Sequence, residues 1–71
     1  MNREDRQALE AIRYTIQQDI SVREDIKRAL EYHDRAFFAQ VVYSVLDQLQ
    51  LTVSDMRRFV NTAYEWFRNR L

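Results

Sequence analysis

The chain contains neither glycine nor proline in its 71 residues. Tight β-hairpins depend on glycine to reach positive backbone φ angles, and loops are usually rich in both residues. The chain is instead rich in Arg, Gln, Glu, Leu and Ala, which lose little side-chain freedom in a helix. The sequence therefore predicts an all-α protein whose connections are short, polar and capped by side chains.

The size and the cysteine content limit how such a fold is stabilised. A chain of this length buries only about 60% of the surface that its unfolded form exposes, so we expect one domain over residues 1–71. It has no cysteine, which excludes disulfides and thiolate metal sites. Stability must then come from packing or from oligomerisation.

The first ten residues carry mixed charges and lack the apolar segment of a secretory signal, so we expect a cytoplasmic protein. Between residues 36 and 54 the only charged side chain is Asp47. Polar residues still interrupt this stretch, which falls short of the roughly 18 unbroken apolar residues of a membrane span. We expect it to form a buried central helix, with no membrane partner.

Apolar residues recur at spacings of three and four along the chain, which predicts a small antiparallel bundle of four helices, approximately 3–18, 22–33, 35–50 and 53–70. Asn2 and Asp34 are suitable N-caps for the first and third helices, and Ser21 begins a capping-box pattern for the second. The apolar stripe changes phase by roughly a third of a turn near residues 32–34, at about 100° per residue. This shift predicts a break, although one continuous helix over 22–50, giving three helices in all, is the alternative.

The last helix has two local start signals. Thr52 is the expected N-cap with Asp55 at the third helical position, and Leu51 can pack on Met56 as a hydrophobic staple. Leu71 is expected to close the apolar stripe of this helix.

No residue pattern indicates catalysis, a cofactor, a metal or a small-molecule substrate. His33 is the only histidine, and we expect it on the apolar face of the second helix as a partly buried core residue. A Glu-x-x-His metal motif is absent because position 30 is leucine. There is no glycine-rich phosphate loop, and adjacent acidic residues diverge by about 100° on a helix, so they form no catalytic pair. We therefore do not expect an enzyme. Glu10 with Arg13, and Glu31 with Arg35, have the spacing of ion pairs on a helix face.

Two surfaces of the last two helices are candidates for binding a protein partner. Phe59 and Trp66 are seven residues apart and lie on one flank of the last helix, with Arg70 nearby. Phe37 and Tyr43 add further aromatic surface on the third helix. Large aromatic side chains beside arginine are typical of interface hot spots. The alternative is that another part of the same chain covers this flank.

A second strip on the last helix contains Arg57, Asn61, Tyr64 and Arg68, at spacings of four, three and four. Such a strip could bind phosphates or acidic side chains, with Tyr64 stacking on the ligand. The alternative is an ordinary solvated edge of the helix.

These features together favour a non-enzymatic protein–protein interaction module, such as a small regulator, adaptor, inhibitor or assembly factor, that self-associates as a homodimer and binds a protein of unknown identity. The alternative is a helix-turn-helix regulator that binds nucleic acid through the start of the last helix, at residues 51–58. Eleven basic residues balance eleven acidic ones, and this zero net charge argues against nucleic acid.

Overall fold

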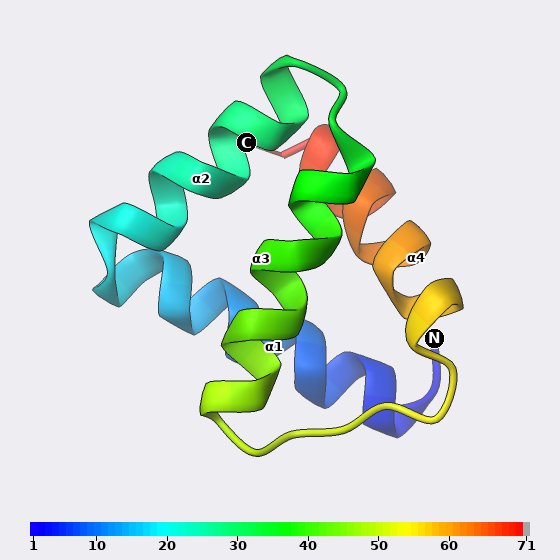
Figure 1. Ribbon diagram of the computed structural model, residues 1–71. Helices are drawn as coiled ribbons and strands as arrows, with labels where there is room; N and C mark the ends of the chain where they lie inside the picture. The colour runs from blue at the N-terminus through cyan, green and yellow to red at the C-terminus, as the bar shows by residue number, and fades with distance from the viewer. Residues whose placement is uncertain (71) are drawn as a thin grey trace.

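The computed structural model describes residues 1–70, and within them the chain forms four α-helices and no strand (Figure 1). Their bounds are α1 (Arg3–Gln18), α2 (Ile20–Glu31), α3 (Arg35–Gln48) and α4 (Met56–Arg68). The prediction of a small all-α bundle with four helices is confirmed, and the alternative of one continuous helix over 22–50 is wrong. Leu71, expected to close the stripe of the last helix, lies outside the described residues.

Two of the predicted N-caps are confirmed. The Asn2 side chain accepts a hydrogen bond from the amide of Asp5 at 2.7 Å, and the Asp34 side chain accepts one from the amide of Phe37 at 3.0 Å. Each of these caps satisfies an amide that has no partner inside its own helix. The break before α3 therefore follows from local sequence chemistry as well as from the phase of the apolar stripe.

The other two N-caps differ from the prediction. Asp19 caps α2 through the amides of Ser21 and Val22, so α2 begins at residue 20 rather than 22. Asp55 caps α4 through the amide of Arg58 at 3.1 Å, so α4 begins at residue 56 rather than 53. Aspartates therefore cap these two helices in place of Ser21 and Thr52, the predicted N-caps. Aspartate is at least as strong an N-cap as serine or threonine.

A tertiary contact accounts for the late start of α4. Residues 49–55 connect α3 to α4 and pass beside the start of α1, where the amide and hydroxyl of Ser54 donate to the carboxylate of Glu4. Val53 is buried, although it lies in this connection and not in a helix. The predicted hydrophobic staple between Leu51 and Met56 requires a helix that starts at residue 53. Because α4 starts later, these two residues do not occupy the positions of a staple.

Both α2 and α3 end without glycine by using another residue in the left-handed conformation. His33 has φ 54°, its amide donates to Leu30, and the amide of Asp34 donates to the carbonyl of Ala29 at 2.8 Å. These are the two hydrogen bonds of a Schellman motif, whose left-handed position usually holds glycine. The expectation that His33 lies partly buried in the core is wrong, because its backbone terminates the helix and its side chain is exposed.

The end of α3 repeats the same arrangement. Gln50 has φ 57°, its amide donates to Asp47, and the amide of Leu51 donates to the carbonyl of Leu46 at 2.9 Å. A chain without glycine therefore closes both helices at the conformational cost of a side chain in the left-handed region.

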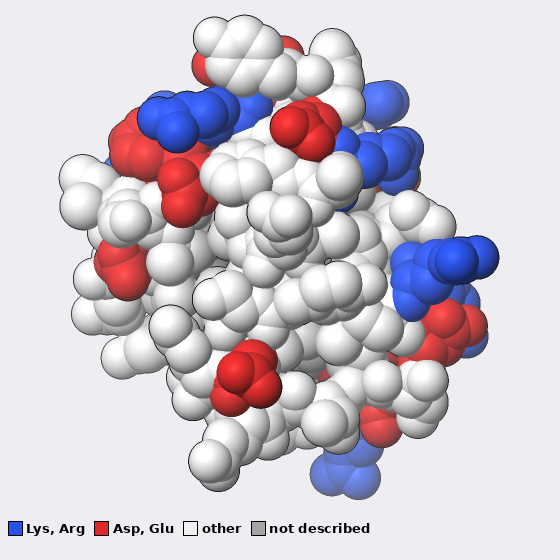
Figure 2. Space-filling view, in the orientation of Figure 1, with Lys and Arg blue, Asp and Glu red and all other residues white. Residues whose placement is uncertain are grey.

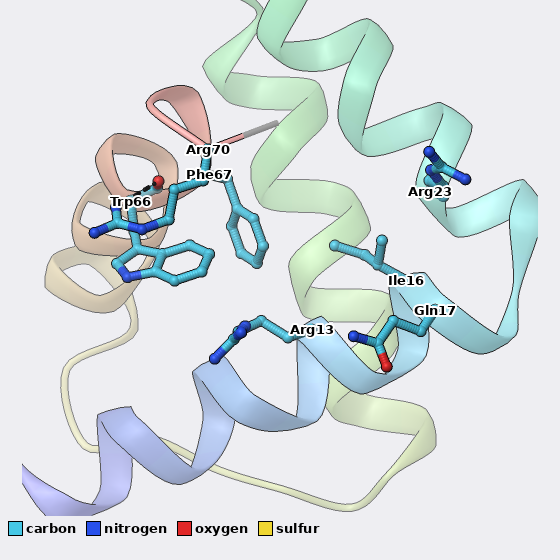
Figure 3. Close-up of a pocket in the computed structure, with 7 residues that line it drawn as sticks. All are labelled: Arg13, Ile16, Gln17, Arg23, Trp66, Phe67 and Arg70. Atoms are coloured by element: carbon cyan, nitrogen blue, oxygen red, sulfur yellow. Dashed lines mark hydrogen bonds between the residues drawn. The ribbon is translucent and has the colours of Figure 1, made fainter.

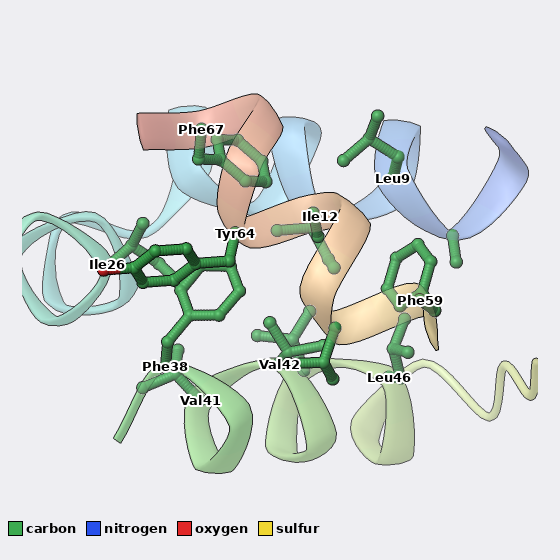
Figure 4. Packing of buried hydrophobic residues seen from close by; sticks show 14 of the residues in the cluster. Leu9, Ile12, Ile26, Phe38, Val41, Val42, Leu46, Phe59, Tyr64 and Phe67 are labelled. Atoms are coloured by element: carbon green, nitrogen blue, oxygen red, sulfur yellow. The ribbon is translucent and has the colours of Figure 1, made fainter. Parts of the chain in front are cut away.

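The central position of α3 is the main feature of the core. It packs against each of the other three helices, and Figure 1 shows it crossing α1 with α2 and α4 on either side. Phe38, Val42 and Leu46 are at most 1% exposed, and the Phe38 ring meets Tyr64 edge-on at a centroid distance of 5.3 Å (Figure 4). The predicted central position of this helix is confirmed, but only its inner face is buried, and its outer side, which includes Tyr43, is exposed. None of the helices in the described part of the chain has the length and apolarity to cross a membrane.

The cap of α4 can be tested by two alanine substitutions. Asp55→Ala is expected to lower the free energy of unfolding by about 1 kcal/mol, since it removes the acceptor for the Arg58 amide. Thr52→Ala, which lies in the connection, is expected to change it by less than about 0.5 kcal/mol. Urea unfolding followed by circular dichroism measures both free energies of unfolding. A larger loss for Thr52→Ala than for Asp55→Ala would show that Thr52 caps the helix.

The left-handed ends of α2 and α3 predict that glycine stabilises this protein at selected positions. His33→Gly is expected to raise the free energy of unfolding by about 0.5 kcal/mol, because relief of the left-handed strain exceeds the extra entropy of unfolded glycine. The matched control is Ser44→Gly in the middle of α3, which should lower it by about 0.5 kcal/mol. If both glycine substitutions changed the free energy of unfolding by the same amount, the left-handed conformation assigned to His33 would be contradicted.

Candidate functional site

The structure separates the aromatic residues that the sequence placed on one flank. Phe59 is completely buried among core residues that include Leu9 and Leu46, so its expected role on the surface is wrong (Figure 4). Trp66 is only half-buried and lies at the margin of the core. The alternative that the chain covers its own flank therefore holds fully for Phe59 and in part for Trp66.

Trp66 is held between two arginines. The guanidinium carbon of Arg70 lies 4.2 Å from the indole centroid and that of Arg13 lies 5.0 Å from it, and Figure 3 shows them approaching from two sides. Arg70 also donates to the backbone carbonyl of Trp66 at 3.1 Å, and the Phe67 ring meets the indole edge-on at 4.9 Å. Cation–π contact thus restricts the motion of both arginine side chains, and the hydrogen bond restricts Arg70 further.

These residues border a cavity of about 410 Å³ between α1, the start of α2 and the end of α4 (Figure 3). We call it the Trp66 groove, and its lining consists of Arg13, Ile16, Gln17, Arg23, Trp66, Phe67 and Arg70. Ile16 and Phe67 are 7% and 2% exposed and form an apolar floor, whereas the arginines and Gln17 are exposed at the rim. No carboxylate belongs to this lining within residues 1–70.

Sequence reasoning found only two of these residues, Trp66 and Arg70, because they lie four residues apart on one helix. Arg13 and Arg23 come from α1 and α2 and reach the groove only through tertiary packing. The position of Arg13 beside the apolar stripe of α1 was the one available signal, and it does not identify which helix lies opposite.

The predicted strip on the last helix is occupied by the chain itself. Tyr64 is 2% exposed, and the guanidinium carbon of Arg35 lies 4.1 Å from its ring centroid. Arg35 also donates to Asn61 at 3.3 Å and to Glu65 at 2.8 Å. The expectation that Tyr64 stacks on an incoming ligand is therefore wrong, because an arginine from α3 takes that place.

Most charged side chains near this strip form ion pairs within the chain. Arg68 pairs with Glu65 at 3.6 Å, while Arg57 is exposed. The expected pair between Glu31 and Arg35 is replaced by Arg35 with Glu65, because α2 ends at Glu31 and the two residues do not share a helix. The pair between Glu10 and Arg13 forms as expected, at 2.8 Å.

The start of α4, which the nucleic-acid alternative requires, has a structural role. Arg58 donates to Asp5 at 3.3 Å, and the Asp5 side chain is only 4% exposed. The connection over residues 49–55 is also longer than the three- or four-residue turn of a helix-turn-helix motif. Within residues 1–70 no three acidic, histidine or cysteine side chains gather in a way that could hold a metal ion.

The remaining candidates lie on α3. Tyr43 is 47% exposed and Phe37 is half-buried. Tyr43 borders a shallow hollow at the end of α3 that Leu51 and Met56 also line. Figure 2 shows few charged side chains over α3: one acidic side chain lies over its lower part and the others gather toward the edges. We call this surface, which includes Tyr43 and Asp47, the weakly charged α3 face.

The positive character of the Trp66 groove can be tested with the protein's single tryptophan. Nearby guanidinium groups should concentrate iodide and repel caesium, so replacing Arg13 and Arg70 by glutamine should lower the ratio of iodide to caesium quenching by about twofold. Arg57→Gln, on the exposed side of α4, should leave this ratio unchanged. A ratio that is insensitive to Arg13 and Arg70 would show that they do not set the potential at the indole.

Comparison of the chain with protein-family models, with curated proteins and with solved structures finds no match in any of the three.

Proposed function

We propose that this chain is a non-enzymatic protein–protein interaction module, of the kind found in small regulators, adaptors, inhibitors and assembly factors, and that it binds its partner through the Trp66 groove. The observation that carries the proposal is the half-buried Trp66 held by Arg13 and Arg70 at the edge of a cavity. A side chain of this size usually completes the core or is covered by its own chain, as Phe59 is.

The energetics of interfaces support this choice. Tryptophan and arginine are enriched among the few residues that supply most of the binding free energy. A docking surface also loses less entropy on binding when its side chains are already ordered. Stacking and a hydrogen bond order Arg70 before any partner arrives, and an ion pair with Glu10 does the same for Arg13.

A nucleic-acid partner has weaker support. The contact of Arg58 with the buried Asp5 ties down one of the two arginines at the start of α4. The formal net charge of zero also gives little long-range attraction for a polyanion.

Self-association remains part of the proposal and involves a different surface. The weakly charged α3 face exposes Tyr43, and Leu49 at the start of the connection to α4 is exposed to the same extent, 47%. Asp47 is the only charged residue between 36 and 54, so two copies that met there would bring together at most this one carboxylate of each chain.

Site-specific photocrosslinking in the native host tests both surfaces. A photoreactive amino acid at position 17, on the rim of the groove, is expected to form an adduct with a foreign protein, whereas position 7, exposed elsewhere on α1, should not. Trp66→Ala should remove the adduct at position 17 while the helical circular dichroism is retained. At position 43 the expected product is a dimer of the 8.7 kDa chain.

Several results of the crosslinking experiment would contradict the proposal. The same adducts from positions 17 and 7, or an adduct that survives Trp66→Ala, would remove the groove as the docking site. An adduct at position 17 that nuclease digests would favour the nucleic-acid alternative. A product at position 43 that lacks a second copy would remove self-association through α3.

A further inference from the structure

The rim and floor of the Trp66 groove differ in chemistry, and this difference restricts what can bind there. Three of its residues are arginines, from α1, from α2 and from the turn that follows α4, and none of its described lining residues is acidic. The floor consists of apolar side chains, chiefly Ile16 and Phe67. A ligand that uses the whole groove must carry negative charge and an apolar group side by side.

The arginines on Trp66 retain donors for such a ligand. The guanidinium carbons of Arg70 and Arg13 lie 4.2 and 5.0 Å from the indole centroid, and one nitrogen of each is engaged, by the Trp66 carbonyl and by Glu10 respectively. Because a guanidinium group has five N–H donors, each side chain can still donate to a carboxylate. Arg23 extends the positive rim to the start of α2, on the other side of the floor (Figure 3).

The size of the cavity agrees with a short segment of chain. A volume of about 410 Å³ lies at the lower end of the range for ligand pockets, roughly 300–1,000 Å³. It has room for apolar side chains of a partner segment while the backbone of that segment stays at the rim.

We propose that the Trp66 groove binds an acidic segment of a partner polypeptide, with carboxylates on Arg13, Arg23 and Arg70 and a bulky apolar side chain against Trp66, Phe67 and Ile16. This inference rests on the proposed function and names the chemistry of the partner. Inorganic phosphate would leave the apolar floor unused, and a long polyanion gains little from a chain of zero net charge.

The test uses short peptides blocked at both ends, so that only their side chains are charged. The first is Glu-Asp-Leu-Phe-Glu-Asp, the second is its neutral form Gln-Asn-Leu-Phe-Gln-Asn, and the third is the acidic form without apolar residues, Glu-Asp-Ser-Ser-Glu-Asp. None contains tryptophan, so the emission of Trp66 reports binding directly, and backbone amide NMR shifts locate it. We expect the first peptide to bind more tightly than either control, and its affinity to fall as salt is raised.

Single substitutions identify the groups that make the contact. Arg13→Gln, Arg23→Gln and Arg70→Gln are each expected to weaken binding of the first peptide about tenfold, the loss of roughly one charge-assisted hydrogen bond. Arg57→Gln is the matched control, because it removes an exposed arginine of α4 outside the groove. Unchanged helical circular dichroism and urea midpoints ensure that the variants are folded.

Several outcomes would overturn the proposal. These are equal binding of the neutral peptide, the same affinity in the three arginine variants, and no binding of the first peptide at about 1 mM. Tighter binding of a single-stranded oligonucleotide would point to nucleic acid, and displacement of the peptide by equimolar phosphate would point to a simple anion site. A position 17 adduct that depends on Trp66, together with any of these results, would preserve the interaction module and reject only its acidic partner.

Discussion

The burial of the inner face of α3 is the constraint on which the rest of this structure depends. Phe38, Val42 and Leu46 on this face are at most 1% exposed, whereas the outer side of the helix faces solvent. The three other helices pack against the inner face, where Phe38 meets Tyr64 and Phe67 of α4. Because α3 occupies the centre, α1, α2 and α4 are brought around it, and the Trp66 groove lies where these three helices come together.

Arginine has two distinct uses in this small protein. Arg35 closes the interface between α3 and α4 by stacking on Tyr64 and binding Asn61 and Glu65. Arg13 and Arg70 lie over an indole that remains partly exposed, beside a cavity. The same cation–π chemistry is thus structural where the ring is buried and available for binding where the ring borders solvent.

Local signals identified the N-caps of two of the four helices. Asn2 and Asp34 cap α1 and α3 as expected, although Asp5 follows Asn2 by three residues and is itself a residue type that caps helices. Ser21 and Thr52 each lie within three residues of an aspartate, Asp19 or Asp55, which became the cap instead. At α4 the choice also reflects the contact of Ser54 with Glu4, fifty residues away in sequence, which no local pattern can reveal.

The absence of glycine and the period of the apolar residues were sufficient to predict an all-α fold and a central third helix, and they favoured a break near residue 33 over one continuous helix. Only the tertiary structure decided that Phe59 and Tyr64 are buried, that His33 is exposed at a left-handed helix end, and that Trp66 faces a groove. The physical reason is that periodicity assigns a side chain to a face of its own helix. Whether that face is covered depends on remote side chains, such as Arg13 of α1 and Arg35 of α3, whose positions are set by packing around α3.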